Sequence, residues 1–330
     1  MKVFLLFSSI IVFTSCNFNT KKTSEGFVSK NNFHSYRTDS TIHSPTKFHP
    51  NIVSTEIDKF NTSFSPNGDT IYYTVTSQKL GLSGIAFQKF IDGNFLPPEL
   101  VPFSSADIPV ADVQISPDGK SLFFSTFKDY QGKPEGFNFN IWVSKLINGK
   151  WQEPEPLGYP ISSTGNEFYP VITTNKTIYF NSDRNGNSDI YYSKYENNNY
   201  QEPIKLPDNI NSDKREADAF IARDESYIIF VRVDEPEGFG NSDLYISFNE
   251  GNGKWTNPTN MGENVNSNQI DGSPYITPDG KYLIFTSGRQ QKNIKEKAIK
   301  SYAQFKAITT SSDNGSLNFY IMSFNPNNYR

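Results

Sequence analysis

The stretch "ISPDGKSLFF" at residues 115–124 has the form of a β-hairpin: an apolar strand, a Pro-Asp-Gly turn and a second apolar strand. The same form recurs as "FSPNGDTIYY" at 64–73 and as "ITPDGKYLIF" at 276–285. Two weaker copies begin at Ile172 and Ile221; the first is one residue shorter in its turn, and the second lacks both Pro and Gly. Five copies of one hairpin indicate a repeat protein.

Each hairpin is followed by a variable loop, a third strand rich in aromatic residues and, in the first four copies, a segment that contains Pro. One repeat therefore supplies four short strands over about 50 residues. A lone four-stranded meander cannot bury both of its faces, whereas sheets arranged radially pack on their neighbours and leave only short edges. We therefore predict an all-β chain that forms a single β-propeller of four-stranded blades. A β-sandwich, the rival all-β solution, does not require so regular a repeat.

The two ends of the repeat region predict how the ring closes. The fifth copy stops after its third strand, at "NFYIMSFNPNNYR" (318–330). The segment "TKFHPNIVSTEIDKFNTSF" (46–64) matches the links that precede the other hairpins. We expect it to supply the missing outer strand of the last blade and so to close a ring of five blades. A sixth blade would need residues 17–60, which carry no hairpin signature.

Three stretches carry a resemblance to a known family: "ISPDGKSLFFS" (115–125), "SDRNGNSDIYYSK" (182–194) and "GKWTNPTNMGENVNS" (253–267). They are similar to the repeats of TolB-type propellers, the WD40-like kind marked by a Pro-Asp-Gly hairpin. The resemblance covers residues 46–330 and extends in particular to lipoproteins of Bacteroidetes with such repeats. It implies a propeller in the cell envelope that serves as a binding or interaction module. It implies no reaction, because propellers carry many unrelated functions.

The N-terminus has the pattern of a secretion signal, in which Lys2 precedes an apolar run too short to span a bilayer. The run ends in "FTSC", which resembles the lipobox of bacterial lipoproteins except that Phe13 stands where Leu is usual. Cys16 is the only cysteine of the chain. We expect residues 1–15 to be removed, Cys16 to be lipidated, and residues 16–45 to form a flexible tether. The alternative is an ordinary signal peptide with a buried, unmodified Cys16.

These features predict a location at the outer membrane, on its periplasmic side or at the cell surface, with the lipid as the only contact with the membrane. The net charge of −4 provides no basic stripe of the kind that nucleic-acid-binding proteins use. We expect a monomer or a component of an envelope complex, whose partner is an envelope protein or a glycan.

Histidine and cysteine are absent from residues 50–330; the three histidines are His34, His43 and His49. A Ser-His-Asp triad, a Cys-His pair and a zinc site with the usual ligands are therefore excluded from the propeller. Carboxylates remain as candidates for acid–base chemistry, and five-bladed propellers occur among glycoside hydrolases. We weigh two functions: a non-catalytic binding or scaffolding module, and a glycan-active hydrolase or lyase.

The links that lead into the first strand of each blade carry six acidic residues. In a propeller these links share one face with the loops between second and third strands, and the hairpin turns lie on the opposite face. Five residues before the last apolar residue of the first strand, three copies have an acid, and the other two have Val110 and Lys59. The repeated acid either binds backbone N–H groups of the neighbouring link or joins a ring of carboxylates that meets a sugar, a cation or a basic peptide. The link acids are Asp58, Asp112, Glu167, Glu216, Asp218 and Asp271.

As a hydrolase or lyase, the chain would use Asp112, Glu167, Glu216 or Asp271 as its acid and base. These acids repeat with the fold, whereas catalytic residues usually break such symmetry, so we favour the binding module. Its site is expected on the face that carries the links and the long loops. The candidate residues there are Glu167, Glu216, Asp218, Asp271, Arg184, Arg232, Arg289, Tyr302 and Phe305.

Three long loops belong to this face, at residues 127–139, 233–240 and 289–315. The middle of the last loop places apolar residues near helical spacing and predicts a helix over residues 293–308. The apolar side of this helix either packs on the rim of the propeller or serves as a lid or a partner-binding surface. The residues in question are Ile294, Ala298, Ile299, Tyr302 and Phe305.

Residues 183–189 place oxygen-bearing side chains at alternate positions, as calcium-binding loops do. Gly186 does not occupy the sixth position that such loops reserve for glycine. We favour a plain turn and expect no cofactor, with calcium as the alternative. The four candidate ligands are Asp183, Asn185, Asn187 and Asp189.

The second strands share one aromatic position, which we predict to be buried between blades. It is occupied by Phe124, Phe180, Phe230 and Phe285. A second aromatic set recurs near the outer strands and is predicted to cap them and not to stack on a ligand. It comprises Trp151, Trp255 and Tyr200.

Overall fold

The computed structural model describes residues 35–36, 40–132, 138–289 and 298–330. The chain divides into two units, Met1–Asn32 and Phe33–Arg330, and only the second contains described residues. The signal sequence, Cys16 and the first part of the tether lie outside the described residues. Their predicted roles therefore stay predictions.

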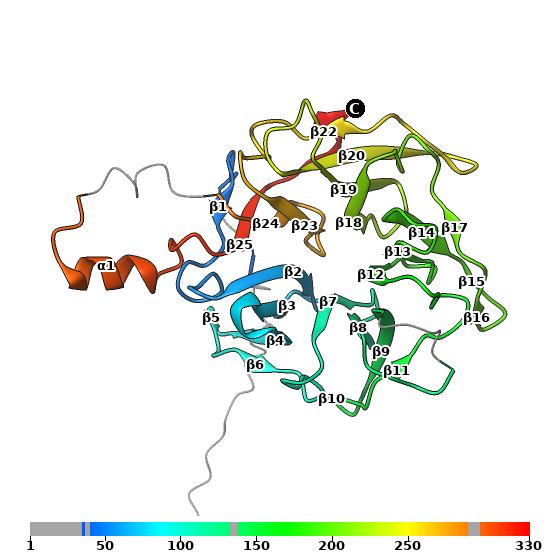
Figure 1. Ribbon diagram of the computed structural model, residues 1–330, viewed down its shortest axis with the longest axis horizontal. Helices are drawn as coiled ribbons and strands as arrows, with labels where there is room; N and C mark the ends of the chain where they lie inside the picture. Colours follow the sequence, from blue (N-terminus) through cyan, green and yellow to red (C-terminus); the bar gives the residue numbers. More distant parts are fainter. Residues whose placement is uncertain (1–34, 37–39, 133–137, 290–297) are drawn as a thin grey trace, which may run out of the picture. The chain divides into compact units, whose positions relative to one another are not determined.

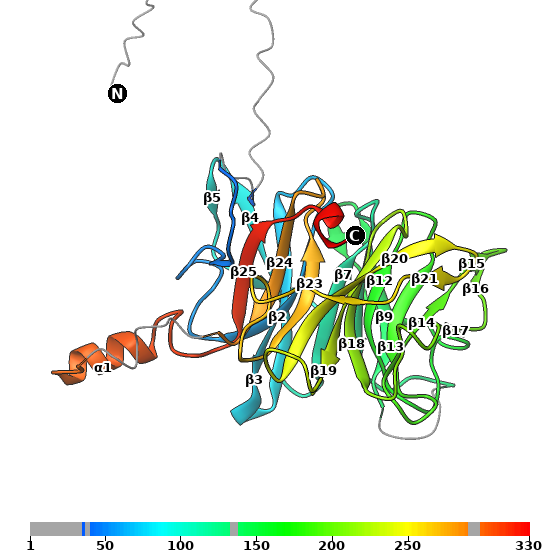
Figure 2. The same cartoon turned by 90° about the horizontal axis from the view of Figure 1, so that it is seen from above.

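Five antiparallel sheets form the blades of a propeller, as the hairpin repeat predicted (Figure 1). In each blade the strands pair in chain order from the first to the third, and a two-residue fourth strand lies outermost. The first strands of all five blades gather at the centre in both views (Figures 1 and 2). They are β2 (Asp58–Phe64), β7 (Val110–Ile115), β12 (Glu167–Ile172), β18 (Arg215–Ile221) and β23 (Asp271–Ile276).

The remaining strands complete the blades at the predicted places. The second strands are β3 (Thr70–Ser77), β8 (Ser121–Thr126), β13 (Ile178–Ser182), β19 (Tyr227–Val233) and β24 (Tyr282–Ser287). The third strands are β4 (Leu82–Ile91), β9 (Asn140–Ile147), β14 (Asp189–Ser193), β20 (Ser242–Gly251) and β25 (Asn318–Ser323). The outer strands of the first four blades are β6 (Glu99–Leu100), β11 (Glu155–Pro156), β17 (Ile204–Lys205) and β22 (Thr259–Asn260). Short two-residue strands pair with the third strands of three blades: β5 (Asn94–Phe95), β10 (Lys150–Trp151) and β21 (Lys254–Trp255). In the third blade, β15 (Tyr195–Glu196) and β16 (Asn199–Tyr200) form a separate hairpin.

The ring closes as predicted, through an N-terminal strand that completes the last blade. β1 (Thr46–Lys47) pairs antiparallel with β25, with Thr46 opposite Ile321 and Lys47 opposite Tyr320. The pairing continues beyond β1, where the Phe48 N–H donates to the carbonyl of Phe319 at 2.8 Å. The fifth blade thus joins both ends of the repeat region, which protects the edges that an open ring would expose.

The hairpin turns explain the Pro-Asp-Gly motif. Gly119 adopts a left-handed conformation with φ of 72°, which glycine accepts without steric cost. Asp118 fixes the same turn, because its carboxylate accepts hydrogen bonds from the Ser116 hydroxyl and the Lys120 N–H. In the shortened third copy, Lys176 takes the left-handed conformation instead, with φ of 69°. A left-handed backbone at a residue other than glycine costs on the order of 1 kcal/mol.

The aromatic residues of the second strands are buried between blades, which confirms their prediction. Phe124 is 2% exposed, and the side chains of Phe180, Phe230 and Phe285 are fully buried. Tyr73 holds the corresponding place in the first blade and is 2% exposed. A shared aromatic position therefore forms the contact that repeats around the ring.

The packed unit begins earlier than the predicted boundary at residue 46. Tyr36 is 2% exposed, and its ring packs edge-on against Phe64 at 5.3 Å between centroids. The Ser35 hydroxyl donates to the carbonyl of Gly68 at 3.0 Å, and the Ile42 N–H donates to the Ser323 hydroxyl. Part of the segment assigned to the tether is therefore held on the propeller, because an aromatic side chain within it can be buried there.

The predicted helix is shorter than expected. α1 spans Tyr302–Thr309 and is capped by the Ser301 hydroxyl, which accepts from the Gln304 N–H. Residues 290–297, which include Ile294, lie outside the described residues. The exposed fractions of Tyr302 and Phe305 are 81% and 50%, and no residue of α1 is buried. The expectation that the apolar side of the helix packs on the rim is therefore wrong for the described part.

Two short 3-10 helices, Gln78–Leu80 and Pro326–Tyr329, complete the described secondary structure. Within the described residues, no helix has the length and apolar character that crossing a membrane requires.

Candidate functional site

The link acids predicted as site residues are buried in ion pairs. Glu167, at the start of β12, is fully buried and accepts hydrogen bonds from the N–H and the hydroxyl of Ser163. The Ser182 hydroxyl donates to the same carboxylate at 3.0 Å, and Arg184 approaches it at 3.3 Å. Arg184 also donates to the carbonyl of Ile161 and lies over the Phe180 ring. The acid therefore joins its own link to the second strand of its blade.

The same arrangement recurs in the next two blades. Asp271 accepts from Ser267 and pairs with Arg289 at 2.8 Å. Glu216 accepts from the Ser212 hydroxyl at 2.6 Å, and the Arg232 guanidinium lies 3.4 Å away. We call these three groups, Glu167–Arg184, Glu216–Arg232 and Asp271–Arg289, the acid–arginine pairs.

The acid–arginine pairs favour the structural interpretation of the repeated acid, with one correction. The acid binds the link that carries it, at a serine four residues earlier, and not the neighbouring link. Burial raises the pKa of Glu167, although hydrogen bonds from Ser163 and the charge of Arg184 oppose the shift. Burial likewise raises the pKa of Glu216. None of the three carboxylates faces an open channel, because each is fully buried.

A second polar ring lies at the axis of the propeller. The residue three positions before the end of each first strand has a left-handed backbone, and each first strand shifts its pairing register there, as at a β-bulge. Asp112 accepts from the Tyr169 N–H at 3.2 Å, and Asp218 accepts from the Ser273 N–H at 3.0 Å. These bonds join neighbouring blades. The five residues, which we call the axial ring, are Asn61, Asp112, Tyr169, Asp218 and Ser273.

Tyr169 fills the centre of the axial ring. Its hydroxyl donates to the carbonyl of Pro274 at 3.2 Å, so the side chain reaches from the third blade to the non-adjacent fifth blade. Tyr169 is 3% exposed and Asp112 is 8% exposed. The axis is therefore packed at this level, and Asp112 has no open space beside it for a substrate.

Asp112 is held in an unusual state of protonation. Burial raises the pKa of its carboxyl to about 7, the charge of Asp218 adds to the shift, and the hydrogen bond from the Tyr169 N–H opposes it. Burial also raises the pKa of Asp218. One carboxyl of this pair carries a proton more readily than an exposed aspartate does at neutral pH.

Asp112→Asn should flatten the pH dependence of stability. Between the unfolded pKa near 4 and the folded pKa of about 7, the native state of the wild type holds more protons, so its stability falls as pH rises. Asparagine keeps the acceptor for the Tyr169 N–H and does not ionise. We expect the variant to gain about 2–4 kcal/mol relative to wild type between pH 4 and pH 8. Urea unfolding of both proteins at pH 4 and pH 8 measures this change. The same difference in unfolding free energy between variant and wild type at both pH values would contradict the prediction.

The calcium candidates are occupied by other partners. Asp183 accepts from the N–H and the side-chain amide of Asn166 at 2.6 and 2.8 Å. Asp189 pairs with Lys205 at 2.7 Å. The side-chain amides of Asn185 and Asn187 donate to the Tyr191 hydroxyl and to the Lys214 carbonyl, respectively. The described residues contain no group of three or more His, Cys, Asp or Glu side chains placed to hold a metal ion.

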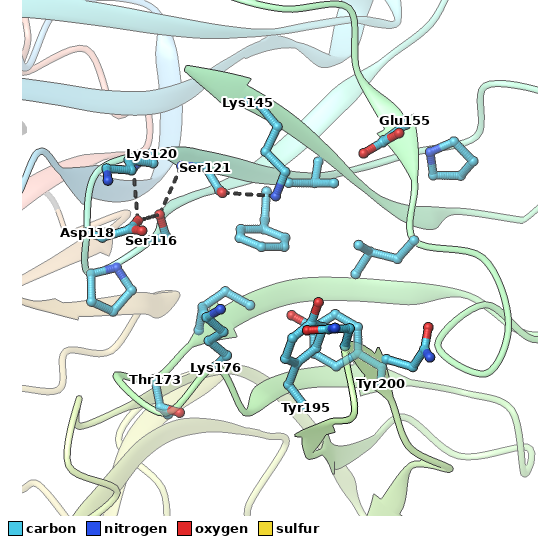
Figure 3. A pocket seen from close by; sticks show the side chains of 18 of the residues that line it. Ser116, Asp118, Lys120, Ser121, Lys145, Glu155, Thr173, Lys176, Tyr195 and Tyr200 are labelled. Carbon is cyan, nitrogen blue, oxygen red and sulfur yellow. Dashed lines mark hydrogen bonds between the residues drawn. The ribbon is translucent and has the colours of Figure 1, made fainter. Parts of the chain in front are cut away.

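A groove of about 1070 Å³ lies between the second and third blades (Figure 3). It is bordered by the hairpin turns of both blades and by the β15–β16 hairpin. These turns belong to the face opposite the links, so the groove is not on the face where we expected the site. We call it the blade 2–3 groove; its side chains include Lys120, Lys145, Lys176, Phe123, Tyr195 and Tyr200.

Three lysines line the blade 2–3 groove. Lys120 and Lys145 come from the second blade and Lys176 from the third (Figure 3). The Lys145 ammonium donates to the Ser121 hydroxyl at 3.1 Å, and the Lys176 ammonium lies 5.3 Å from the centre of the Tyr195 ring. Among the described residues, none of the three ammonium groups forms an ion pair.

The acidic side chains of the groove differ from the lysines, because two of the three have partners. Asp118 is bound within its turn, and Glu202 accepts from the Tyr159 hydroxyl. Glu155 also lines the groove. Hydrogen bonds fix the positions of two of the three carboxylates but leave their negative charges in place, and the charge of Lys120 also acts on Asp118.

Aromatic rings stand beside the lysines. Tyr195 and Tyr200 pack edge to face with centroids 5.0 Å apart, and both line the groove (Figure 3). Tyr200 was expected to cap an outer strand and not to meet a ligand; it does extend an outer hairpin, but it also borders the groove. Trp255 is 7% exposed and packs in the core, as a cap does.

No family model matches the chain, and no curated protein matches it. Solved structures are similar at low identity. A TolB-like protein from Agrobacterium tumefaciens is 16% identical with a TM-score of 0.45, over 86% of this chain and 78% of the other. A GH62 hydrolase in complex with xylotriose is 12% identical with a TM-score of 0.47, over 86% of this chain and 95% of the other. A thermostable family-43 glycoside hydrolase is 12% identical with a TM-score of 0.46, over 72% and 86%. Similarity at this level concerns the arrangement of strands and says nothing of activity.

Proposed function

We propose that this chain is a non-catalytic binding propeller of the cell envelope, and that it holds an acidic polysaccharide in the blade 2–3 groove. The observation that carries the proposal is the set of three lysines without ion-pair partners beside two tyrosine rings. This proposal retains the binding function that the sequence suggested. It places the site on the face of the hairpin turns, opposite the face that was expected.

The placement of the three lysines favours an anionic ligand, although three carboxylates also line the groove. Lys120 and Lys145 extend from one wall and Lys176 from the other, so a chain lying between them meets cations on both sides. An ammonium group pairs with a carboxylate or a sulfate as a compact charge that adapts to different geometries. Repeated acidic units along a polymer suit such a spread of single charges better than one small anion does.

The uncharged part of the lining favours a sugar over a peptide. Hydroxyl and amide side chains of Thr173, Thr174, Asn198, Asn199 and Gln201 border the groove. Sugar hydroxyls form hydrogen bonds with such groups, and the C–H face of a sugar ring packs on an aromatic ring. The cores of protein-binding surfaces are instead depleted of charged residues, lysine among them.

The placement of the predicted acids weighs against the hydrolase alternative. A glycoside hydrolase needs two carboxyl groups about 5–10 Å apart that flank the scissile bond. Glu167, Glu216 and Asp271 are fully buried in the acid–arginine pairs, and Asp112 lies in the packed axial ring. None of these four residues lines the blade 2–3 groove.

Attachment to the envelope is part of the proposal and rests on the sequence. Cys16 follows the apolar run of a secretion signal, which supports lipidation there. Labelling with a radioactive fatty acid tests it: the wild type should carry the label and Cys16→Ala should not. Label retained on the variant would contradict lipidation at Cys16.

The groove lysines should account for most of the affinity for an acidic glycan. A triple variant, Lys120→Ala with Lys145→Ala and Lys176→Ala, removes three ion pairs that are each worth about 0.5–1 kcal/mol near the surface. We expect about a tenfold to hundredfold weaker binding of polygalacturonate. Isothermal titration measures the loss, and a neutral galactan should bind wild type less tightly than polygalacturonate does.

The chain offers a matched control for this triple variant. Lys281 and Lys89 occupy in other blades the places of Lys120 and Lys145, and Lys254 is a third exposed lysine outside the groove. Replacing these three by Ala changes the net charge equally and should leave affinity within about twofold. Equal losses in both triple variants would mean that binding depends on net charge alone and would contradict the groove.

A further inference from the structure

A second cavity, on the face that carries the links, is lined in part by a lysine that the binding proposal does not use. It has a volume of about 480 Å³ and lies on the first blade, between the link before β2 and the link after β6. Apolar side chains form most of its wall, and Lys59 is one of the residues that line it. We call it the blade 1 pocket; its apolar lining includes Ile52, Val53, Ile57, Val75, Leu82 and Leu100.

Lys59 departs from the repeat. It occupies the position that holds an acid in the three acid–arginine pairs, and it is 2% exposed. Its amine donates to the Thr55 hydroxyl at 2.8 Å and to the Ile57 carbonyl at 2.9 Å. Among the described residues, no carboxylate forms an ion pair with it. Two donated hydrogen bonds match the two N–H groups of a neutral amine and leave its lone pair free.

The surroundings of Lys59 favour the neutral amine. Burial lowers its pKa to about 8, although the charges of Glu56 and Asp58 oppose the shift. A lysine desolvated in an apolar pocket is a nucleophile at neutral pH, because a substantial fraction of it carries no proton. An exposed lysine, with a pKa near 10.4, is almost wholly protonated there.

The walls of the pocket select an uncharged, apolar ligand. Most hydroxyl groups along the wall have partners within the protein: for example, Ser83 donates to the Val110 carbonyl, and Ser104 accepts from the Ile85 N–H. Few polar groups are thus left for a peptide or a sugar. Glu99 lines the pocket, and Glu56 and Asp58 act on Lys59 from nearby, so an anionic ligand is repelled.

We propose that Lys59 captures an apolar aldehyde in the blade 1 pocket as an imine. The neutral amine adds to the aldehyde carbon, the carbinolamine loses the aldehyde oxygen as water, and a C=N bond replaces the C=O bond. No oxidant or reductant takes part. A proton from solvent converts the imine to the iminium, whose positive charge the neighbouring acids stabilise, and the hydrocarbon chain lies along the apolar wall.

Reductive trapping tests the proposal on the whole protein. Decanal is added with sodium cyanoborohydride, which converts an imine to a stable amine, and the modified lysines are located by peptide mass mapping. Lys59 should be labelled at least tenfold faster than Lys89, Lys254 and Lys281. Acetaldehyde, which has no chain to bury, should show only the smaller preference that the neutral amine provides. Absence of label on Lys59, or an equal preference with both aldehydes, would overturn the proposal.

Two variants separate the nucleophile from the pocket. Lys59→Arg keeps the charge and removes the nucleophile, so preferential labelling by decanal should disappear while the other lysines react as before. Leu100→Asn changes a wall residue that is 57% exposed without adding a charge, and it should lower labelling of Lys59 by decanal at least fivefold without affecting acetaldehyde. Ile204→Asn, at an isoleucine of similar exposure on the third blade, is the control and should change neither. Unchanged decanal labelling in Leu100→Asn would contradict a role for the apolar wall.

Discussion

Phe230→Ala should lower the free energy of unfolding by about 3–5 kcal/mol, because it opens a large cavity in the core. Phe230 is fully buried and belongs to the apolar cluster that joins the third and fourth blades. Its ring also supports the Arg232 guanidinium at 5.6 Å and the Tyr245 ring at 6.4 Å. Urea unfolding followed by tryptophan fluorescence measures the loss.

Phe305→Ala is the matched control for this substitution. Phe305 is 50% exposed on α1, so its truncation should change stability by about 0.5 kcal/mol or less. A loss below about 1 kcal/mol in Phe230→Ala would contradict the assignment of this repeated aromatic position to the contact between blades.

Arg289→Ala should lower the free energy of unfolding by about 3–5 kcal/mol, because it leaves the carboxylate of Asp271 buried without its cation. Asp271 is fully buried, and Arg289 approaches it at 2.8 Å. The same guanidinium donates to the Val265 carbonyl and lies 5.0 Å from the centre of the Phe285 ring. Removing it therefore loses packing as well as charge.

The double variant Asp271→Asn with Arg289→Met separates charge from packing. It removes both charges and restores an apolar side chain, so it should lose less stability than Arg289→Ala alone. If these acids were catalytic, Glu167→Gln and Glu216→Gln would abolish turnover of a glycan and keep the wild-type melting temperature. That result would contradict the structural role of the acid–arginine pairs.

The propeller could be predicted from the sequence because the hairpin repeat is a local signal. A turn with Pro, Asp and Gly specifies its own conformation, as Gly119 and Asp118 show. Closure was also predictable, because the fifth copy lacks an outer strand and residues 46–64 match a link. The five copies therefore predict both the four-stranded form of each blade and the number of blades.

The partners of the link acids were harder to predict. The register of Glu167, Glu216 and Asp271 is visible in the sequence, but their arginines are not in one register. Arg232 lies directly opposite Glu216, whereas Arg184 lies two residues beyond Ser182, the residue opposite Glu167. Arginines at different positions along the chain thus reach equivalent acids, which the alignment of the copies conceals.

The blade 2–3 groove could not be predicted because it depends on the contact between two blades. The sequence places the hairpin turns on the face opposite the expected site and predicts Tyr200 to be a cap. One signal was present: the third hairpin is the only shortened copy, and it places Lys176 in a left-handed turn where the first, second and fifth copies have Gly. A departure from the repeat therefore marked one border of the groove, and Lys59 marks the blade 1 pocket in the same way.

Lysine footprinting tests the central claim most directly. Brief acetylation with and without polygalacturonate, followed by mass spectrometry, compares the reactivity of each lysine on the intact protein. Binding in the groove predicts at least threefold slower acetylation of Lys120, Lys145 and Lys176, and unchanged rates at Lys89, Lys254 and Lys281. Unchanged acetylation rates at the three groove lysines in the presence of polygalacturonate would contradict binding in the groove.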